Sequence, residues 1–596
     1  MSSPRTLRSW ARLCEHVRVF AISTALAGGA CSKSPSAEPT SAGSAQSGSG
    51  SGSGSGSAAQ PDLALGVLHF NVSGGSSAAR AQFAQGLLAL HSFWYDEAIT
   101  QFQAAIATDP TFAMAYWGLA MSHAKLLWGD DDLAAGRDAL TRMPAPNTLP
   151  PHDQAWVMAA LTLYKHASLD VHRSRQEFLA IMEQVNAKFP DEESALFLAL
   201  AILSVVHPND PDELAQRRRA GALAAGVFKT NPKHPGAAHY LLHAYDHPEL
   251  AELALPAAEA YASIAPAAFH ALHMPAHIFA RLGRWKAAAA SCQAAWDASV
   301  TWVHRDHLSL DHQDFHSLAW LIEINFERGR RGDGDRAMAL YADAVKAGLT
   351  NDKRAAFANQ VGSYLARTGE WNRVDELLEP LAAPAAEPKA AWTSTSTAQA
   401  CGRTPEGNGA PTKLFEKRAV ISTRALAAAM LHDTAKLTKL LAAKTAVDAE
   451  LHPFLVATQA KEFVASVDAL QPIVGAALTA RAKGDVKGLL AALQPLATDQ
   501  EQEFTGEGTA GGVLRAEEIA EILLELGQAR QAVDAFTAVL ARHAGRARSL
   551  LGAARAATKA GDLVAARAFY AKLLAVWVDA EPGTPGLDEA RANVAP

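Results

Sequence analysis

The chain has 596 residues, of which 49% are hydrophobic and 19% are charged, and its formal net charge at pH 7 is −7. This composition excludes a chain that is disordered throughout, and the acidic balance argues against nucleic acid as a partner. Alanine occurs along the whole sequence, which is typical of helices packed through small side chains. We therefore expect a folded and mainly helical protein.

The first 30 residues have the features of an export signal. Four arginines precede a short apolar run, VFAISTALAGGA at 19–30, which is too short to span a bilayer. The sequence LAGGAC resembles a bacterial lipobox, which implies that Cys31 is lipidated after cleavage. Gly28 stands where a lipobox usually has a large aliphatic residue, so simple export or an uncleaved anchor remains an alternative.

A linker follows the predicted signal. Residues 32–60 contain no large apolar side chain and are rich in glycine and serine, a composition that stays flexible. A flexible tether behind a lipidated cysteine predicts a protein of the bacterial cell envelope, anchored to a membrane on its periplasmic or surface side.

Cysteine is scarce in the part of the chain expected to fold. Two of the four cysteines lie in or directly after the signal, which leaves Cys292 and Cys401. No CxxC pair or disulfide framework is present. A bond between Cys292 and Cys401 in an oxidising envelope is one interpretation, and a buried helical cysteine with a separate loop cysteine is the interpretation we favour.

A repeated helical pattern organises the chain after the linker. In GLLALHSFWYDEAITQFQAAIATDP, small, aromatic and proline residues fall at offsets 0, 9, 12, 16, 19 and 24: Gly86, Tyr95, Ala98, Phe102, Ala105 and Pro110. This pattern resembles the tetratricopeptide repeat, a 34-residue helix-turn-helix unit. Near the C-terminus the same signature occurs twice, 34 residues apart, with Gly527, Ala532 and Phe536 matching Gly561, Ala566 and Tyr570.

The resemblance implies an all-α fold, a tetratricopeptide-type solenoid of helical hairpins that forms a right-handed superhelix behind a flexible N-terminal tether. The first helix of each hairpin would line a concave surface on which a protein or peptide partner binds. The predicted organisation is an export signal at 1–30, the lipobox cysteine and linker at 31–61, N-terminal hairpins at 62–150, divergent hairpins at 151–233, histidine-rich hairpins at 234–346, divergent hairpins at 347–470 with a long loop at 380–413, and C-terminal hairpins at 471–596.

Half of the 22 histidines lie within residues 234–316. Four of them form pairs with a spacing of four, which places both rings of a pair on one helix face: His239 with His243, and His273 with His277. The two pairs are 34 residues apart, as are Pro232 and Pro266, so they occupy equivalent places in consecutive repeats. Pro275 lies inside the second pair and is expected to kink the helix that carries it.

In the tetratricopeptide family these positions face the groove, and the same register brings further polar residues there. Because packed helices lie about 8 to 10 Å apart, we expect the four paired rings to converge on one metal ion at about 2 Å per bond. The candidate metal-binding residues are His239, His243, Asp246, His247, His270, His273, His277 and His316. The alternative is that the histidines form hydrogen bonds or bind a peptide without metal.

A nitrogen-rich ligand set favours a transition metal, with zinc preferred and copper or iron left open. The sequence lacks the HExxH, Walker and GxSxG motifs, so any catalysis would be metal-assisted, with Asp246 or Glu249 as proton acceptors. The catalytic residues and the substrate stay open.

A weaker polar site is predicted in the C-terminal hairpins, where acidic and basic residues share the inner register: Glu517, Glu521, Arg548 and Arg555. They would either bind a peptide or pair with one another, and we favour internal pairing.

Three functions follow. The first is an envelope protein that binds a transition metal in its groove, together with a protein partner. The second is a metal-free interaction scaffold. The third is a metal-dependent enzyme, hydrolytic or oxidative.

Overall fold

The structure is a computed structural model that describes residues 64–128, 131–165, 171–208, 210–386, 409–458, 461–503 and 512–594. The predicted signal, the lipidated Cys31, the linker, Cys401 and most of the loop at 380–413 lie outside these residues. Within them every regular element is an α-helix or a short 3₁₀ turn, so the predicted all-α class is confirmed. In the described part of the chain, no helix combines the length and the apolar character that a membrane crossing needs.

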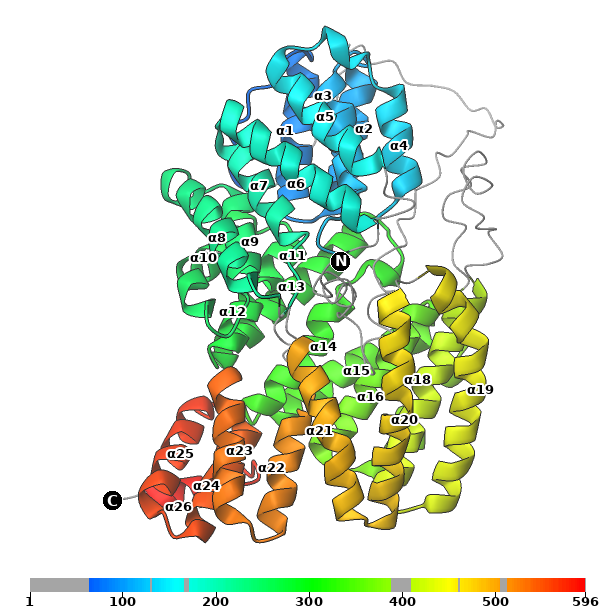
Figure 1. Ribbon diagram of the computed structural model, residues 1–596, viewed down its shortest axis with the longest axis vertical. Helices are drawn as coiled ribbons and strands as arrows, with labels where there is room; N and C mark the ends of the chain where they lie inside the picture. The colour runs from blue at the N-terminus through cyan, green and yellow to red at the C-terminus, as the bar shows by residue number, and fades with distance from the viewer. Residues whose placement is uncertain are drawn as a thin grey trace, which may run out of the picture.

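Helices follow one another with short connections, so that sequence neighbours pack as hairpins (Figure 1). α1 and α2, for example, are separated by three residues. The helices of the first half are α1 (Ser77–His91), α2 (Tyr95–Thr108), α3 (Ala113–Ser122), α4 (Leu133–Arg142), α5 (Pro151–Lys165), α6 (Val171–Lys188), α7 (Glu192–Leu203), α8 (Glu213–Thr230), α9 (Pro235–Tyr245), α10 (Ala251–Ile264), α11 (Phe269–His273), α12 (Pro275–Arg281) and α13 (Trp285–Arg305).

The second half contains longer helices in its middle and hairpins of regular length at its end. Its helices are α14 (Phe315–Glu327), α15 (Arg331–Gly348), α16 (Asn351–Thr368), α17 (Val374–Leu377), α18 (Gly409–Met430), α19 (Thr434–Thr458), α20 (Lys461–Lys483), α21 (Val486–Glu503), α22 (Arg515–Glu525), α23 (Ala529–Arg542), α24 (Ala547–Ala560), α25 (Leu563–Val576) and α26 (Leu587–Val594). The 3₁₀ turns are Pro146–Thr148, Leu310–His312, Trp371–Arg373 and Glu379–Ala382.

Small residues let helices approach where the repeat pattern predicts it. Phe102 is fully buried against Gly118, where an added Cβ would lie 2.3 Å from the ring. Phe536 packs in the same way against Gly552, also at 2.3 Å. The close contact of an aromatic side chain with a glycine on the next helix therefore recurs at both ends of the array.

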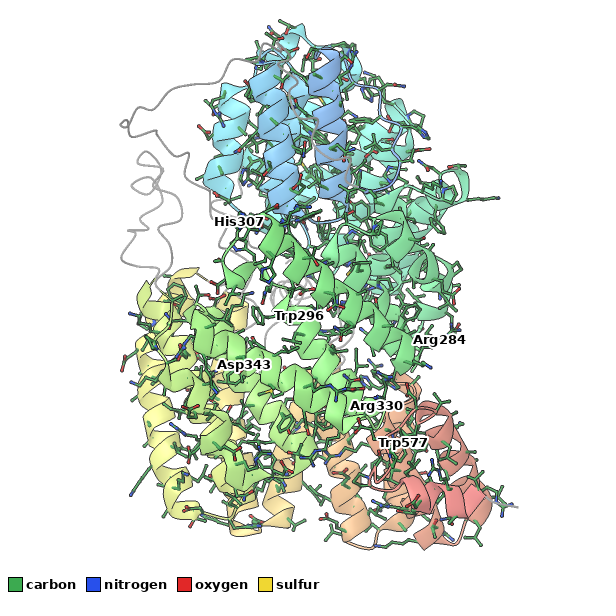
Figure 2. All side chains as sticks on the ribbon, turned by 180° about the vertical axis from the view of Figure 1, so that it is seen from behind. Arg284, Trp296, His307, Arg330, Asp343 and Trp577 are labelled. Atoms are coloured by element: carbon green, nitrogen blue, oxygen red, sulfur yellow. The ribbon has the colours of Figure 1, made fainter. Side chains whose placement is uncertain are left out.

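The described chain bends back on itself. From α14 it runs through α16, α18 and α20, and then returns through α21 so that α22–α26 lie beside α12 and the start of α15 (Figure 1). From behind, Trp577 of the C-terminal hairpins lies close to Arg330 (Figure 2). Hydrogen bonds join these distant segments, including one from the Glu581 amide to the Gly329 carbonyl at 2.9 Å. Helices α22–α26 and the turns that connect them contact α12–α15. We call these the closure contacts.

Candidate metal centre

In the described chain, histidines from separate helices lie close together, and their ring nitrogens are near enough to bind one metal ion. Three groups each place one candidate ligand atom per residue within 4.8 Å of the others. The inner centre comprises His239, His243 and His270. The outer centre comprises His273, His277 and His316. The buried triad comprises His91, Glu193 and His234.

The four paired rings do not converge on one point as predicted; the described chain brings the candidate ligands together in two groups of three histidines. Each HxxxH pair stays together, and its third member comes from the start of the next first helix in the array. His270 and His316 are both the second residue of their helices, and each follows a phenylalanine. Rings four residues apart in helical register can meet at their nitrogens, as they do within each pair. The two centres adjoin through α11, where the ring centroids of His270 and His273 are 6.4 Å apart.

Pro275 separates the two histidines of the outer pair. α11 ends at His273 and α12 begins at Pro275, with Met274 between them. Proline is tolerated at the first position of a helix because its missing N–H would have no intrahelical partner there. The helix break therefore lies between His273 and His277, and their Nε2 atoms remain 3.0 Å apart.

In the inner centre the far nitrogen of one ligand is fixed by the backbone. Nδ1 of His239 lies 2.6 Å from the carbonyl oxygen of His91. A carbonyl only accepts, so Nδ1 carries the proton and Nε2 of the neutral ring presents a lone pair. That lone pair faces Nε2 of His243 at 2.9 Å and Nε2 of His270 at 3.1 Å. A cation shared by the three nitrogens would satisfy this arrangement.

The surroundings of His239 keep its ring neutral. His239 is fully buried, and Phe93 and Tyr261 cover its ring at centroid distances of 4.4 and 5.3 Å. Burial, and then the charges that His243 and His270 would carry, lower the pKa of His239 well below its usual value. A neutral imidazole is the form that binds a metal ion.

In the outer centre a carboxylate holds the first ligand. Nδ1 of His277 donates to Asp246 at 3.0 Å, and the other Asp246 oxygen accepts from Nε of Arg281 at 2.7 Å. Burial would raise the pKa of Asp246, but Arg281 and His277 outweigh it and hold that pKa well below its usual range. An ionised carboxylate only accepts, so His277 presents its Nε2 lone pair to the centre.

A hydroxyl holds the second ligand of the outer centre. Nδ1 of His273 lies 2.9 Å from Oγ of Ser317, and that hydroxyl also bonds to the Asp314 carboxylate. Because the Ser317 proton is directed to Asp314, Nδ1 of His273 donates to Ser317 and its Nε2 is unprotonated. Two Nε2 lone pairs, from His273 and His277, therefore face each other at 3.0 Å.

Two lone pairs at this distance need a positive charge between them. A shared proton is one way to supply it, but burial, followed by the charges of His316 and His277, lowers the pKa of His273 well below its usual value. A tetrahedral zinc ion with bonds of about 2.0 to 2.1 Å would hold its ligand nitrogens about 3.3 Å apart. The observed spacing is a few tenths of an ångström shorter, so small ring movements would seat a metal ion.

The third outer ligand is open to solvent. His316 is exposed, and its ring centroid lies 4.7 Å from that of His273. Trp320, one turn further along α14, covers the His277 ring at 4.5 Å. Three protein ligands leave a fourth tetrahedral position for water or another ligand.

Two predicted ligands lie outside both centres. Asp246 ends α9 and contacts the far nitrogen of His277, so it supports a ligand and does not join the three-histidine set. His247 accepts from the Glu249 backbone N–H at Nδ1, with a distance of 3.1 Å, and lies in none of the three groups. Both residues follow the end of the helix, where the chain no longer keeps the helical register that placed them on the groove face.

Sequence reasoning missed the buried triad. Glu193 accepts from Nε2 of His91 at 2.7 Å and from Nε2 of His234 at 2.9 Å, and all three side chains are fully buried. The Tyr240 hydroxyl lies 2.9 Å from the other nitrogen of His91. These hydrogen bonds satisfy the Glu193 carboxylate, so we assign the triad a structural role behind the inner centre. The signal in the sequence was a pair of glutamates at the start of the helix 192–203, which is apolar after Ser194.

No protein-family model matches the chain, and no curated protein matches it. Among solved structures, the yeast Tom70 structure matches 86% of this chain and 95% of its own at 12% identity, with a TM-score of 0.22. The tetratricopeptide domain of P58(IPK) matches 87% and 98% at 12% identity, with a TM-score of 0.18. The fold is a tetratricopeptide-like array of hairpins. Scores this low add nothing about function, and the array is established by the helices of the chain itself.

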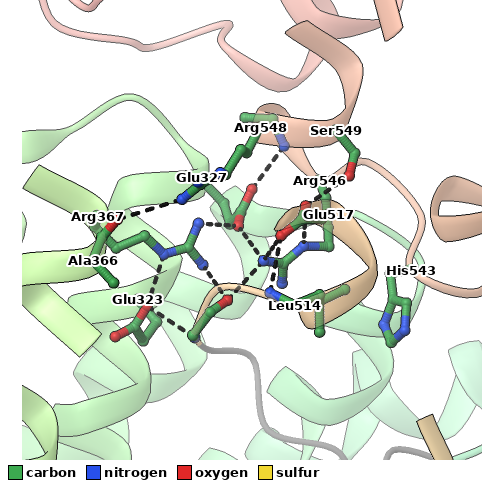
Figure 3. Close-up of polar contacts among 12 residues, drawn as sticks. Glu323, Glu327, Ala366, Arg367, Leu514, Glu517, His543, Arg546, Arg548 and Ser549 are labelled. Atoms are coloured by element: carbon green, nitrogen blue, oxygen red, sulfur yellow. Dashed lines mark hydrogen bonds and ion pairs between the residues drawn. The ribbon is translucent and has the colours of Figure 1, made fainter. Parts of the chain in front are cut away.

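The charged residues predicted in the C-terminal groove pair with other side chains, and Figure 3 shows Glu517 beside Arg546. Glu517 binds the Arg546 guanidinium through both oxygens at 2.9 and 2.8 Å, while Arg548 pairs with Glu521. Arg555 pairs with Glu589 near the surface. These ion pairs correspond to the internal pairing that we favoured over a peptide site.

Proposed function

We propose that this protein binds transition-metal ions through the inner and outer centres. The observation that carries the proposal is the pair of Nε2 lone pairs of His273 and His277, which face each other at 3.0 Å while both Nδ1 atoms are committed elsewhere. Imidazole ligands suit zinc, copper and iron, and zinc remains our preferred ion. The three-ligand sets favour about one ion in each centre.

Elemental analysis of the full mature chain after reconstitution with zinc tests this proposal. We expect about two equivalents for the wild type, and less than about 0.2 equivalents for the His243→Ala/His277→Ala variant, because each substitution removes one of the three ligands of a centre. His452→Ala is the matched control, since His452 pairs with Asp468 at the surface. A wild-type protein that retains less than about one-tenth equivalent of zinc, copper or iron would refute the proposal.

A metal-dependent enzyme is the second candidate, and the exposure of His316 favours it. An ion held by three histidines at a solvent-facing position can bind and activate water. Hydrolytic and oxidative activity screens on the wild type and the His243→Ala/His277→Ala variant separate catalysis from binding. Metal-dependent turnover in the wild type alone supports catalysis, and its absence leaves metal binding.

The cell-envelope location and a protein partner belong to the same proposal. The lipobox-like LAGGAC sequence and the linker support a lipid-anchored protein, and the hairpin array is a fold suited to binding a protein or peptide. Mass spectrometry of the mature N-terminus tests the anchor. An unmodified Cys31, or cleavage at another position, would rule it out.

A further inference from the structure

Two of the three helices that carry the outer ligands end at the closure contacts, and the third is α11, which carries His273. α12 carries His277 and α14 carries His316. Beyond these histidines, each helix runs toward the C-terminal hairpins. The outer centre and the closure contacts therefore share the same two helices.

The end of α14 is held by several contacts. The Glu327 carboxylate accepts from the Ala547 backbone N–H at 2.7 Å, and the Glu327 carbonyl accepts from the Trp577 indole at 3.1 Å. Arg367 of α16 also pairs with Glu327 at 2.9 Å. Glu327 is almost completely buried, so these contacts fix the position of α14 along its axis.

The turn after α12 meets the C-terminal hairpins backbone to backbone. A Cβ on Gly283 would lie 2.8 Å from the Ala544 carbonyl oxygen, and a Cβ on Gly545 would lie 2.9 Å from the Gly283 Cα. The Trp285 indole donates to the Gly545 carbonyl at 2.7 Å. The same turn, 544–546, thus lies next to Ala547, which binds Glu327 of α14.

The inner centre is held by other parts of the chain. His239 donates to the His91 carbonyl at the end of α1, and Arg217 of α8 donates to the His243 carbonyl at 3.1 Å. These supports come from the N-terminal half of the array. Loosening the C-terminal hairpins should therefore leave the inner centre assembled.

We infer that the closure contacts assemble the outer centre, by holding α12 and α14 at the spacing at which His277 and His316 share one ion. This inference rests on the proposed metal binding. Glu327 and Trp577 are positioning residues, since they act on the ligands only through the helices that carry them. Because coupling between two sites is reciprocal, an ion in the outer centre also stabilises the docking of α22–α26.

Cobalt(II) titration of the full chain tests the inference. The outer centre is measured in a His243→Ala background and the inner centre in a His277→Ala background, each combined with Glu327→Gln or Trp577→Ala. We expect outer-centre binding to weaken by about 10-fold or more, as for other groups that position ligands. Inner-centre binding should change by less than about twofold, because distant sites act independently. Arg555→Ala is the matched control, since its ion pair lies within the C-terminal hairpins.

Amide exchange supplies a second measurement that a general loss of stability would not reproduce. Cobalt(II) should slow exchange in α23–α25 of the His243→Ala protein but not of the His316→Ala protein. If Glu327→Gln and Trp577→Ala both leave metal binding at the outer centre unchanged, this inference is wrong while the proposed function stands. Equal weakening of binding at both centres would also show that the inference is wrong. A wild-type chain that binds no metal ion overturns the proposed function together with it.

Discussion

Two buried polar regions of this molecule satisfy their atoms in opposite ways. In the charged network next to the closure contacts, carboxylates face guanidinium groups: Glu323 with Arg367 at 3.1 Å, and Glu517 with Arg546 at 2.8 Å (Figure 3). In the outer centre, the Nε2 lone pairs of His273 and His277 face each other at 3.0 Å. The first region pairs its carboxylates with positive charges, whereas the two facing nitrogens of the outer centre need a cation between them.

Helix α14 belongs to both regions, which makes the comparison direct. Its first turn carries His316, and its last two turns carry Glu323 and Glu327. Burial alone does not separate the two regions, because both contain almost fully buried polar side chains. The difference lies in the atoms that face one another. Buried polar atoms that have no donor or opposite charge among their neighbours indicate a ligand site.

The largest effect on stability is expected for Arg546→Ala. This change leaves Glu517 buried beside Glu327 without its guanidinium, and breaking a buried ion pair costs about 3 to 5 kcal/mol. Native-state hydrogen exchange in α22–α26 measures the loss. A loss below about 1 kcal/mol, as found for exposed pairs, would show that the network is solvated and that the comparison is wrong.

Asp246→Asn should weaken metal binding at the outer centre by about 10- to 100-fold, because it removes the charge that orients His277. Inner-centre binding should stay unchanged, since His239 is oriented by a backbone carbonyl. Zinc competition titrations in the His243→Ala and His277→Ala backgrounds measure the two centres separately. Equal losses at both would contradict the assignment of Asp246 to the outer centre.

His247→Gln should make the protein less sensitive to acid. Burial, together with the positive charges of Arg217, Arg281 and Arg542, lowers the pKa of His247 from 6.5 to about 4. Between these values the unfolded chain binds a proton that the folded chain does not, so this histidine lowers the stability as the pH falls through that window.

Thermal unfolding midpoints of the metal-free His247→Gln and wild-type proteins, measured from pH 7 to pH 4, test this sign. The wild type should lose more stability than the variant. Adding zinc at pH 7 should leave the difference between the two proteins unchanged, because His247 lies in neither centre. Parallel pH profiles would contradict the lowered pKa.

The smallest effect is expected for Arg555→Ala. Its partner Glu589 and its own side chain are both partly exposed, at 33% and 48%, so the pair should contribute less than about 1 kcal/mol. Metal binding should not change at either centre. Differential scanning calorimetry measures the change in stability, and zinc titration measures metal binding. A large change in either would show that the C-terminal hairpins are coupled to the rest of the protein by more than the closure contacts.

The helical hairpins and the register of the paired histidines could be predicted from the residues alone. The 34-residue spacing repeats because each hairpin must bury the same apolar positions against its neighbour, and this constraint is local enough to be visible in the residues. Gly527 and Gly561, which belong to that pattern, both have positive φ values, of 75° and 81°.

The grouping of the histidines into threes depends on how the helices pack and could not be predicted from the residues. His270 and His316 join pairs that lie 27 to 43 residues away in sequence, and which pair each one joins depends on how successive helices stack. Glu193 reaches His91 from a helix more than 100 residues further along the chain. The closure contacts depend on the summed curvature of many hairpins, and no single repeat encodes it.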